Sequence, residues 1–274
     1  MIAPAVKIIS LLAKMALIAG LAGMLAKRQQ NIADFEESLI PMLAWCGVIC
    51  GLIAMTNVST AILLFLTCML LLFIGRVPLK YLAMLALVGV FIGVIAGSFG
   101  QRGNTAVNRV QDFMSQTEVP YQAEQSYIAI ATGGILGKGP GNSDQRNFLP
   151  HPYSDFVYAI IIEEYGMIGG LFVLFLYLVL LYRGMKVVAN SDRAFGGLLS
   201  AGLTFAIVIQ ALVNIGVVVG LGPVTGQTLP LISMGGTSLL FTGLSLGIIL
   251  SVSKGDQADF DAVSGVVKNK AKVI

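Results

Sequence analysis

Residues 156–182 read FVYAIIIEEYGMIGGLFVLFLYLVLLY, an apolar run in which Glu163 and Glu164 are the only charged side chains. The hydrocarbon core of a bilayer is about 30 Å thick, and roughly 20 helical residues cross it. The run is longer than this requirement and therefore predicts a membrane-spanning helix. Because a carboxylate inside a span is costly, the two glutamates indicate a function or a partner within the protein.

The composition of the whole chain indicates a polytopic membrane protein. Hydrophobic residues make up 56% of the chain and charged residues 11%, and the mean hydropathy is +0.86, which excludes an ordinary soluble domain. Backbone polar groups in lipid must bond within the segment, so these runs are expected to be helices. We predict an all-α integral membrane bundle of about seven transmembrane helices, near residues 8–26, 39–55, 59–74, 80–98, 156–182, 197–219 and 229–253.

We expect one membrane domain over residues 1–274, divided by the predicted spans. Its parts are the first four spans (8–99), a long extracytoplasmic loop (100–154), the last three spans (155–253) and a cytoplasmic tail (254–274). Lys and Arg are retained on the cytoplasmic side of short loops. They gather here on alternate connections and in the tail, at Lys27, Arg28, Arg76, Lys80, Arg183, Lys186, Arg193 and Lys254. The net charge of +3 gives no indication of a nucleic-acid partner.

This orientation places the N-terminus outside the membrane, although residues 1–26 lack the features of a cleaved signal peptide. Lys7 and Lys14 interrupt the apolar run of this segment. We therefore expect that this sequence begins late, after helices that normally precede Met1.

The three cysteines fall in two neighbouring spans. Cys46 and Cys50 are one helical turn apart, and Cys68 lies in the next span. No ligand spacing typical of a metal site is present, so we expect a packing role for the thiols and no metal site.

The predicted outer loop ends in a glycine-rich segment with glycines at 133, 134, 137, 139 and 141. Successive N–H groups in such a segment can bind an anion, and Gly137 and Gly139 are candidates for that role. A phosphate also needs cations, and the loop offers them at Lys138, Arg146, Arg102 and Arg109. The alternative is that the glycines only let the loop pack on helices, while the charges remain solvated.

Asp155 stands between this loop and the helix that begins at Phe156. A carboxylate at the membrane interface could act as a general base on a sugar hydroxyl. Alternatively, Ser154 or Asp155 is an ordinary N-cap, which requires no catalysis.

Other polar groups lie in the predicted spans. By the helical rise, Glu163 and Glu164 should be about 12–13 Å deeper than Asp155. Glu163 is nearer to the face of Asp155, and pairing with a group such as Lys14 is an alternative to catalysis. Gln210 and Asn214 are expected to form hydrogen bonds between helices. His151 is the only histidine, and two further ligands at metal spacing are absent.

Four blocks of this sequence resemble the SEDS family (shape, elongation, division and sporulation) of membrane glycosyltransferases. They cover AIATGGILGKGPGNS (129–143) with Tyr121-Gln122 and Gln125-Ser126 before it, FLPHPYSDFVYAIIIEEYG (148–166), NIGVVVGLGPVTGQTLPLISMGGTSLL (214–240) and, more faintly, residues 102–113. The amino-acid sequence of the loop is similar to that of the cell-division, FtsW-like branch of the family. The family implies that the spans here are its last seven, with its first three missing. The sequence departs from the family pattern at His151-Pro152-Tyr153-Ser154.

The resemblance implies an inverting peptidoglycan glycosyltransferase that polymerises a lipid-linked disaccharide-peptide (lipid II) on the outer face of the membrane during cell division. Asp155 would be the catalytic base. Lys138, Arg146, Arg102, Arg109, Gly137, Gly139 and Ser233 would bind substrate. No cofactor is certain, although a divalent cation could bridge the pyrophosphate and the carboxylate.

The family also implies a place and partners for the chain. These are the bacterial inner (cytoplasmic) membrane, at the division septum, with a class B penicillin-binding transpeptidase and other division proteins. Two other functions fit the residues: a transporter (flippase) of the lipid-linked precursor, indicated by intramembrane glutamates, and an inactive division scaffold.

Overall fold

The computed structural model describes residues 2–29, 39–99, 108–109, 111, 113–115, 120–149 and 153–271. Arg102 and His151 lie outside the described residues. The regular elements of the described part are all helical, in the order α1 (Ile2–Lys27), α2 (Ile40–Thr56), α3 (Val58–Ile74), α4 (Leu79–Phe99), α6 (Tyr121–Gly133), the 3₁₀ turn η3 (Gln145–Asn147), α7 (Val157–Asn190), α8 (Ala194–Val218) and α9 (Gly236–Ala271). The predicted all-α fold is confirmed.

Each predicted span corresponds to a helix, but the helices differ in apolar length. Three are long and apolar enough to cross a membrane: Ser10–Lys27, Val157–Asn190 and Ala194–Val218. The other apolar helices of the described part are shorter: Ile40–Thr56, Val58–Ile74, Leu79–Gly89 and Ser238–Lys254.

One residue, Asn57, joins α2 to α3 in a tight hairpin. The backbone N–H of Asn57 donates to Ile53 O at 2.8 Å and so ends α2. The Asn57 side-chain oxygen accepts from Thr60 N at 3.2 Å and caps α3. A single asparagine therefore satisfies backbone groups of both helices at their shared end.

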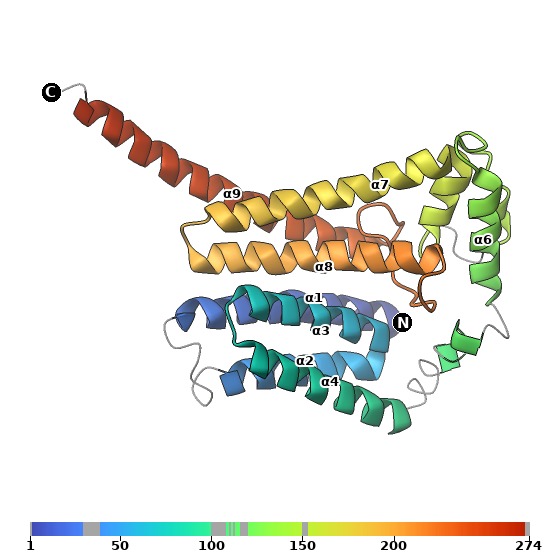
Figure 1. Cartoon of the computed structure of the whole chain (residues 1–274), viewed down its shortest axis with the longest axis horizontal. Coiled ribbons are helices and arrows are strands. Elements are labelled where there is room, and N and C mark those ends of the chain that lie inside the picture. Colours follow the sequence, from blue (N-terminus) through green and yellow to red (C-terminus); the bar gives the residue numbers. More distant parts are fainter. Residues whose placement is uncertain are drawn as a thin grey trace.

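The helices lie side by side in a bundle with two apolar clusters (Figure 1). One cluster joins α1, α2 and α3 to α8, and the other joins α7, α8 and the end of α6. Gly202 of α8 permits a close approach of α1 and α3, because a Cβ there would lie 2.5 Å from Ile18 and 3.2 Å from Leu71. Small residues at such positions let membrane helices pack closely.

The helix predicted over residues 156–182 is present as α7, but it contains a break at Gly166 that the sequence analysis did not anticipate. Gly166 has φ 70° and ψ −174°, a conformation that favours glycine. The part of α7 before the break lies beside α6 at the end of the bundle, whereas the long part runs along the bundle (Figure 1). The turns of α7 that carry Glu163 belong to this first part, and the membrane depth predicted for Glu163 stays a prediction.

The loop before α7 pairs with the break and satisfies its backbone groups. Lys138 N donates to Glu163 O and Gly139 N to Glu164 O, both at 2.9 Å, while Met167 N donates to Gly134 O at 2.9 Å. A Cβ on Gly166 would lie 2.1 Å from Ile135 O, so no other residue fits there without a shift of the loop.

Two further boundaries differ from the sequence prediction. The last span begins at Gly236, because residues 229–235 form a turn instead of a helix, and its helix continues to Ala271.

The loop before α7 contains α6, which the sequence analysis missed. The available signal was a row of small residues at helical spacing, Ala123, Ser126, Ala129 and Gly133, which are the buried positions of α6.

Candidate functional site

Asp155 lies just before α7, and its carboxylate does not cap that helix. The N-cap position is Phe156, and no side-chain cap hydrogen bond is formed there. Asp155 Oδ1 accepts from Ser154 Oγ at 2.9 Å. Asp155 Oδ2 lies 3.7 Å from the position of a Cβ on Gly226. The half-buried carboxylate therefore has one oxygen oriented by a neighbour and the other facing the α8–α9 connection.

Three consecutive carbonyl groups hold the backbone at Asp155. Tyr153 O accepts from Met234 N at 2.8 Å, Ser154 O accepts from Ser233 Oγ at 2.5 Å, and Asp155 O accepts from Asn214 Nδ2 at 2.8 Å. We call this set of three hydrogen bonds the carbonyl clamp. Fixing a reactive side chain by its own backbone limits the geometries that it samples, as a catalytic group requires.

The α8–α9 connection that supplies the clamp is itself anchored to two helices. Asn214 Nδ2 also donates to Gln227 O at 2.6 Å, and Gln227 Nε2 donates to Thr60 Oγ1 of α3 at 2.9 Å. Gln210 Nε2 donates to Thr228 O at 2.9 Å. The prediction that Gln210 and Asn214 bridge helices directly is wrong, because both bond the backbone of this connection.

Ser233 is buried and has two hydrogen-bond partners in the site. Its Oγ donates to Ser154 O and accepts from Leu229 N at 2.8 Å. The geometry gives this hydroxyl a positioning role, and its predicted contact with substrate stays a prediction. Arg109 reaches the same connection, where its Nη1 donates to Val224 O at 3.1 Å in an exposed position.

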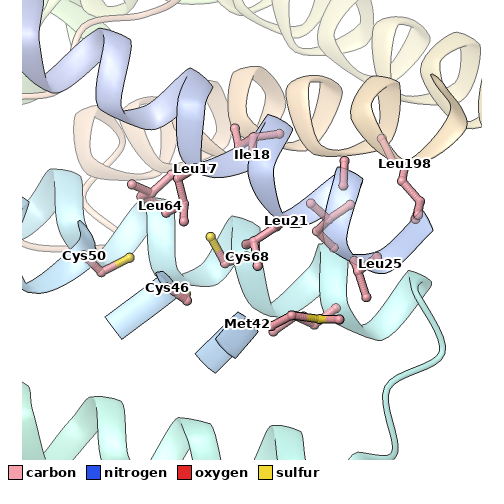
Figure 2. Close-up of a cluster of buried hydrophobic side chains, with 14 of the residues drawn as sticks. Leu17, Ile18, Leu21, Leu25, Met42, Cys46, Cys50, Leu64, Cys68 and Leu198 are labelled. Atoms are coloured by element: carbon pink, nitrogen blue, oxygen red, sulfur yellow. The ribbon is translucent and has the colours of Figure 1, made fainter. Parts of the chain in front are cut away.

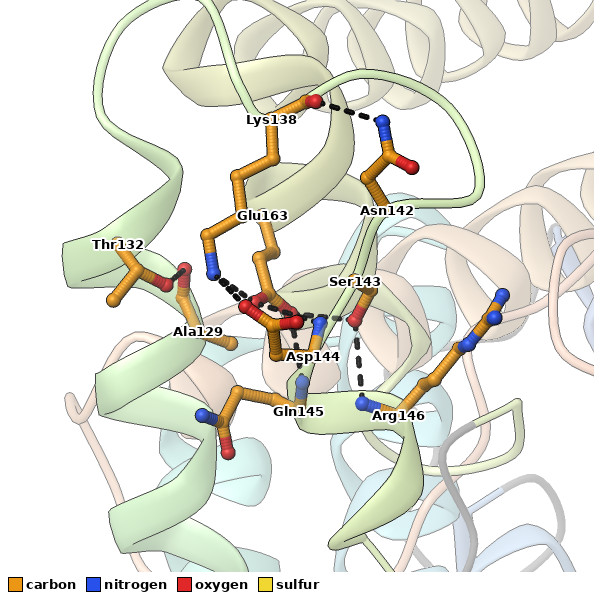
Figure 3. Close-up of polar contacts among 9 residues, drawn as sticks. All are labelled: Ala129, Thr132, Lys138, Asn142, Ser143, Asp144, Gln145, Arg146 and Glu163. Atoms are coloured by element: carbon orange, nitrogen blue, oxygen red, sulfur yellow. Dashed lines mark hydrogen bonds and ion pairs between the residues drawn. The ribbon is translucent and has the colours of Figure 1, made fainter.

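A second polar cluster surrounds Glu163 at the other end of the first part of α7 (Figure 3). The Glu163 carboxylate is fully buried and accepts from Lys138 Nζ at 2.7 Å and Ser143 Oγ at 2.5 Å. It also accepts from two backbone N–H groups, Asp144 N at 3.2 Å and Gln145 N at 3.3 Å. The predicted pairing of Glu163 with Lys14 is therefore wrong, since Lys138 of the loop before α7 supplies its cation.

Lys138 joins two acids in this cluster. Its Nζ lies 2.7 Å from Glu163 Oε1 and 2.9 Å from Asp144 Oδ2. The hydrogen bond that Lys138 donates to Glu163, followed by the one that it donates to Asp144, raises the pKa of Lys138 above its ordinary value. The ammonium therefore stays charged at neutral pH, where the glutamate is ionised as well.

The glycine amides of the loop are used within the protein. Gly137 N donates to Gly133 O at 2.9 Å, and Gly139 N donates to Glu164 O. Gly137 has φ +80°, and a Cβ on it would lie 2.3 Å from Glu164 O. This geometry matches the alternative in which the glycines allow the loop to pack on helices, and an anion role for Gly137 and Gly139 stays a prediction.

The structure thus separates the predicted substrate-binding residues into two groups. Ser233 and Arg109 contact the segments around Asp155, while Lys138, Gly137, Gly139 and Arg146 lie in or beside the Glu163 cluster. The two groups are about 12 Å apart along the helix, by the rise of eight residues. The Arg146 side chain points away from Glu163 (Figure 3), and its guanidinium has no partner among the described residues.

Among the described residues, Asp155 belongs to no group of three potential metal ligands, and the one such group is Cys46, Cys50 and Cys68. A divalent cation at Asp155 would therefore take most of its ligands from substrate oxygens and water. This cation stays a prediction.

Replacing Asn214 by Leu is expected to destabilise the protein by about 2–4 kcal/mol, because Asp155 O and Gln227 O would each lose a buried donor. Thermal unfolding of the purified protein in detergent would measure the change. Leu212→Ala is a matched control on the same helix, since Leu212 is exposed. Equal unfolding temperatures for the Asn214 variant and the control would contradict the anchoring role of Asn214.

Comparisons with known proteins give one consistent result. The family profile described as "Cell cycle protein", named for FtsW, RodA and SpoVE, matches residues 9–258. Stage V sporulation protein E of Bacillus subtilis is 34% identical over 252 residues, which cover 88% of this chain and 67% of that protein. A probable peptidoglycan glycosyltransferase FtsW of Mycobacterium tuberculosis is 38% identical over 250 residues, which cover 89% of this chain and 47% of that protein.

Solved structures show the same likeness. A structure titled "Structural coordination of polymerization and crosslinking by a peptidoglycan synthase complex" matches with a TM-score of 0.71 at 25% identity, covering 90% of this chain and 70% of that chain. The rod shape determining protein RodA of Thermus thermophilus matches with a TM-score of 0.57 at 25% identity, covering 86% and 63%. This chain spans about half to two thirds of the length of the two curated relatives.

Proposed function

This chain belongs to the cell cycle protein family of FtsW, RodA and SpoVE, and we propose that it is a peptidoglycan glycosyltransferase that acts at the outer face of the bacterial cytoplasmic membrane. Its substrate is a lipid-linked disaccharide-peptide, from which it makes glycan strands during cell division. The observation that carries the proposal is Asp155, a carboxylate free of helix capping whose backbone is held by the carbonyl clamp. The relatives named FtsW support the reaction class.

Asp155 acts as the general base in a single displacement. Its carboxylate accepts the proton of the acceptor sugar's 4-hydroxyl while that oxygen forms a bond to C1 of the donor sugar. The bond from C1 to the pyrophosphate oxygen breaks, and the lipid pyrophosphate leaves with the electron pair. Attack from the opposite face inverts C1, so one carboxylate suffices. Ser154 Oγ holds Asp155 Oδ1, which leaves Oδ2 for the hydroxyl proton.

Cations stabilise the charge that develops on the leaving pyrophosphate. Arg109 is the best placed described cation, because it contacts the connection that faces Asp155. Arg146 is a second candidate. Lys138 is held by Glu163 and Asp144, and its contribution is to order the loop. If a divalent cation binds, it would supply further charge stabilisation at the same oxygens.

A class B penicillin-binding transpeptidase at the division septum is the partner that we propose. A solved structure with the same fold has a title that describes a complex coordinating polymerisation and crosslinking. Polymerised strands must be crosslinked to form a wall, so a transpeptidase would consume the product where it is made.

Polymerisation of purified lipid-linked precursor tests the proposal. The full chain, reconstituted with its transpeptidase, is expected to make glycan strands that separate on a gel. A transporter would instead move labelled precursor between bilayer leaflets without making strands. The sequence analysis took Glu163 and Glu164 as glutamates within a span and therefore as an indication of a transporter. In the structure, both lie in the part of α7 at the end of the bundle.

Cysteine labelling tests the orientation. Asn147 is exposed in the outer loop, and Asp192 is exposed in the α7–α8 connection. Asn147→Cys is expected to react with an impermeant maleimide in intact cells, whereas Asp192→Cys should react only after the membrane is opened. The three native cysteines are buried and serve as the unlabelled background. The opposite pattern would place Asp155 on the cytoplasmic side and contradict the proposed reaction.

A further inference from the structure

All three cysteines of the chain come together at one place in the fold. The chain has three cysteines among 274 residues, and their sulfur atoms lie within 4.8 Å of one another. Figure 2 shows them between α2 and α3, beside the side chains of α1. We call this group the thiol triad. The three cysteines of two helices thus share one site, although two of them are separated from the third by about twenty residues of sequence.

The hairpin of α2 and α3 explains how the triad forms. Cys46 and Cys50 are four residues apart and so lie on the same face of α2. That face packs against α3, where Cys68 is fully buried. None of the three thiols forms a disulfide. The triad therefore presents three thiols to a common centre.

The separation of the sulfur atoms suits a single bound atom. At the greatest separation of 4.8 Å, three sulfurs would lie about 2.8 Å from their common centre, against roughly 2.3 Å for a metal–sulfur bond. A centre with a lone pair is pyramidal and lies out of the plane of the sulfurs, so each sulfur would move by roughly 0.8 Å at most to bind it, which rotation of a cysteine side chain supplies.

The surroundings of the triad decide which charge the bound atom should have. Cys46 and Cys68 are 0% exposed and Cys50 is 8% exposed, within an apolar cluster that includes Leu17 and Leu64. A net charge in such a place is costly. Three thiolates around a monovalent ion leave a charge of minus two, and around a divalent ion minus one. A trivalent centre leaves none.

We propose that the thiol triad is a binding site for trivalent arsenic, taken up as arsenous acid. Three sulfur–arsenic bonds form and three arsenic–oxygen bonds break. The three thiol protons leave with the three hydroxyl groups as water, so neither oxidant nor reductant is needed. Reactants and product are neutral, which suits a neutral solute entering an apolar site. Cys50, the one member of the triad with some exposure, is the point of entry.

Native mass spectrometry of the whole chain tests the site. The protein is reduced with a phosphine, so that no competing thiol is present, and mixed with arsenous acid. The expected result is a mass gain of one arsenic less three hydrogens, with a sulfur-to-arsenic absorbance in the ultraviolet. Because the ligand binds only the folded state, the unfolding temperature should rise with arsenic concentration.

Variants separate binding by the triad from binding elsewhere. Replacing Cys46, Cys50 or Cys68 singly by Ala should abolish stoichiometric binding. Met42→Leu is the matched control, because it removes a buried sulfur of the same cluster and should bind as the wild type does.

A parallel titration of the wild type with Cd²⁺ distinguishes the ligand classes without any variant. Binding of Cd²⁺ in preference to arsenic would overturn the argument from neutral charge. Unchanged mass and absorbance with both would show that the thiols only pack as small apolar groups, which would also overturn the proposal.

Discussion

Asp155→Asn is expected to lower glycan polymerisation by 10²–10⁴-fold, the usual worth of general-base catalysis, and to leave the protein folded. The amide keeps the size of the side chain and an oxygen that accepts from Ser154 Oγ. The carbonyl clamp uses only backbone oxygens of residues 153–155 and is unaffected. Only the capacity to accept the hydroxyl proton is lost. Strand formation from labelled precursor, together with the unfolding temperature, would measure both effects.

Ser154→Ala is the matched control for this variant. It removes the hydrogen bond to Asp155 Oδ1 but retains the carboxylate, so its loss of activity should be smaller than that of Asp155→Asn. Polymerisation by the Asp155 variant above about a tenth of the wild-type rate would exclude a general-base role. A large drop in its unfolding temperature would instead assign Asp155 to stability.

Glu163→Ala is expected to have the largest effect on stability, about 2–4 kcal/mol, because it removes the buried acceptor of four hydrogen bonds, one of them from an ammonium. The variant leaves Lys138 Nζ, Ser143 Oγ and two backbone N–H groups without their common acceptor. The loop would then lose its main attachment to α7. Yield in detergent and thermal unfolding would report the change.

Glu164→Ala provides the comparison, because this neighbouring carboxylate forms no ion pair within the described residues. Its unfolding temperature should remain close to that of the wild type. Combining Glu163→Gln with Lys138→Met removes both charges and should recover part of the stability, since a neutral pair has no unpaired buried charge. Equal unfolding temperatures for Glu163→Ala and Glu164→Ala would contradict the anchoring role.

Hydropathy alone was enough to predict the helices of the bundle and their order. Each span is a local property, because an apolar run of sufficient length has one solution in lipid. The position of Asp155 at the start of α7 was also predictable, since it follows a polar loop directly. Its role as catalytic base stays a prediction until the variant is measured.

Contacts between distant segments could not be predicted in the same way. Ser154 and Ser233 are 79 residues apart, and Gln227 and Thr60 are 167 apart, so no local pattern indicates either pair. The break at Gly166 depends on the loop that packs against it. Cys68 likewise meets Cys46 only through the packing of α2 on α3.

The carbonyl clamp can form only late in the synthesis of the chain. A ribosome completes Asp155 well before Ser233 and Met234, which hold its neighbours. A nascent chain that has emerged only to the end of α8 thus carries the reactive carboxylate without two of the three donors of the carbonyl clamp. Chains arrested before residue 229 should be cleaved by protease near Tyr153, and protection equal to that of the finished chain would exclude this order.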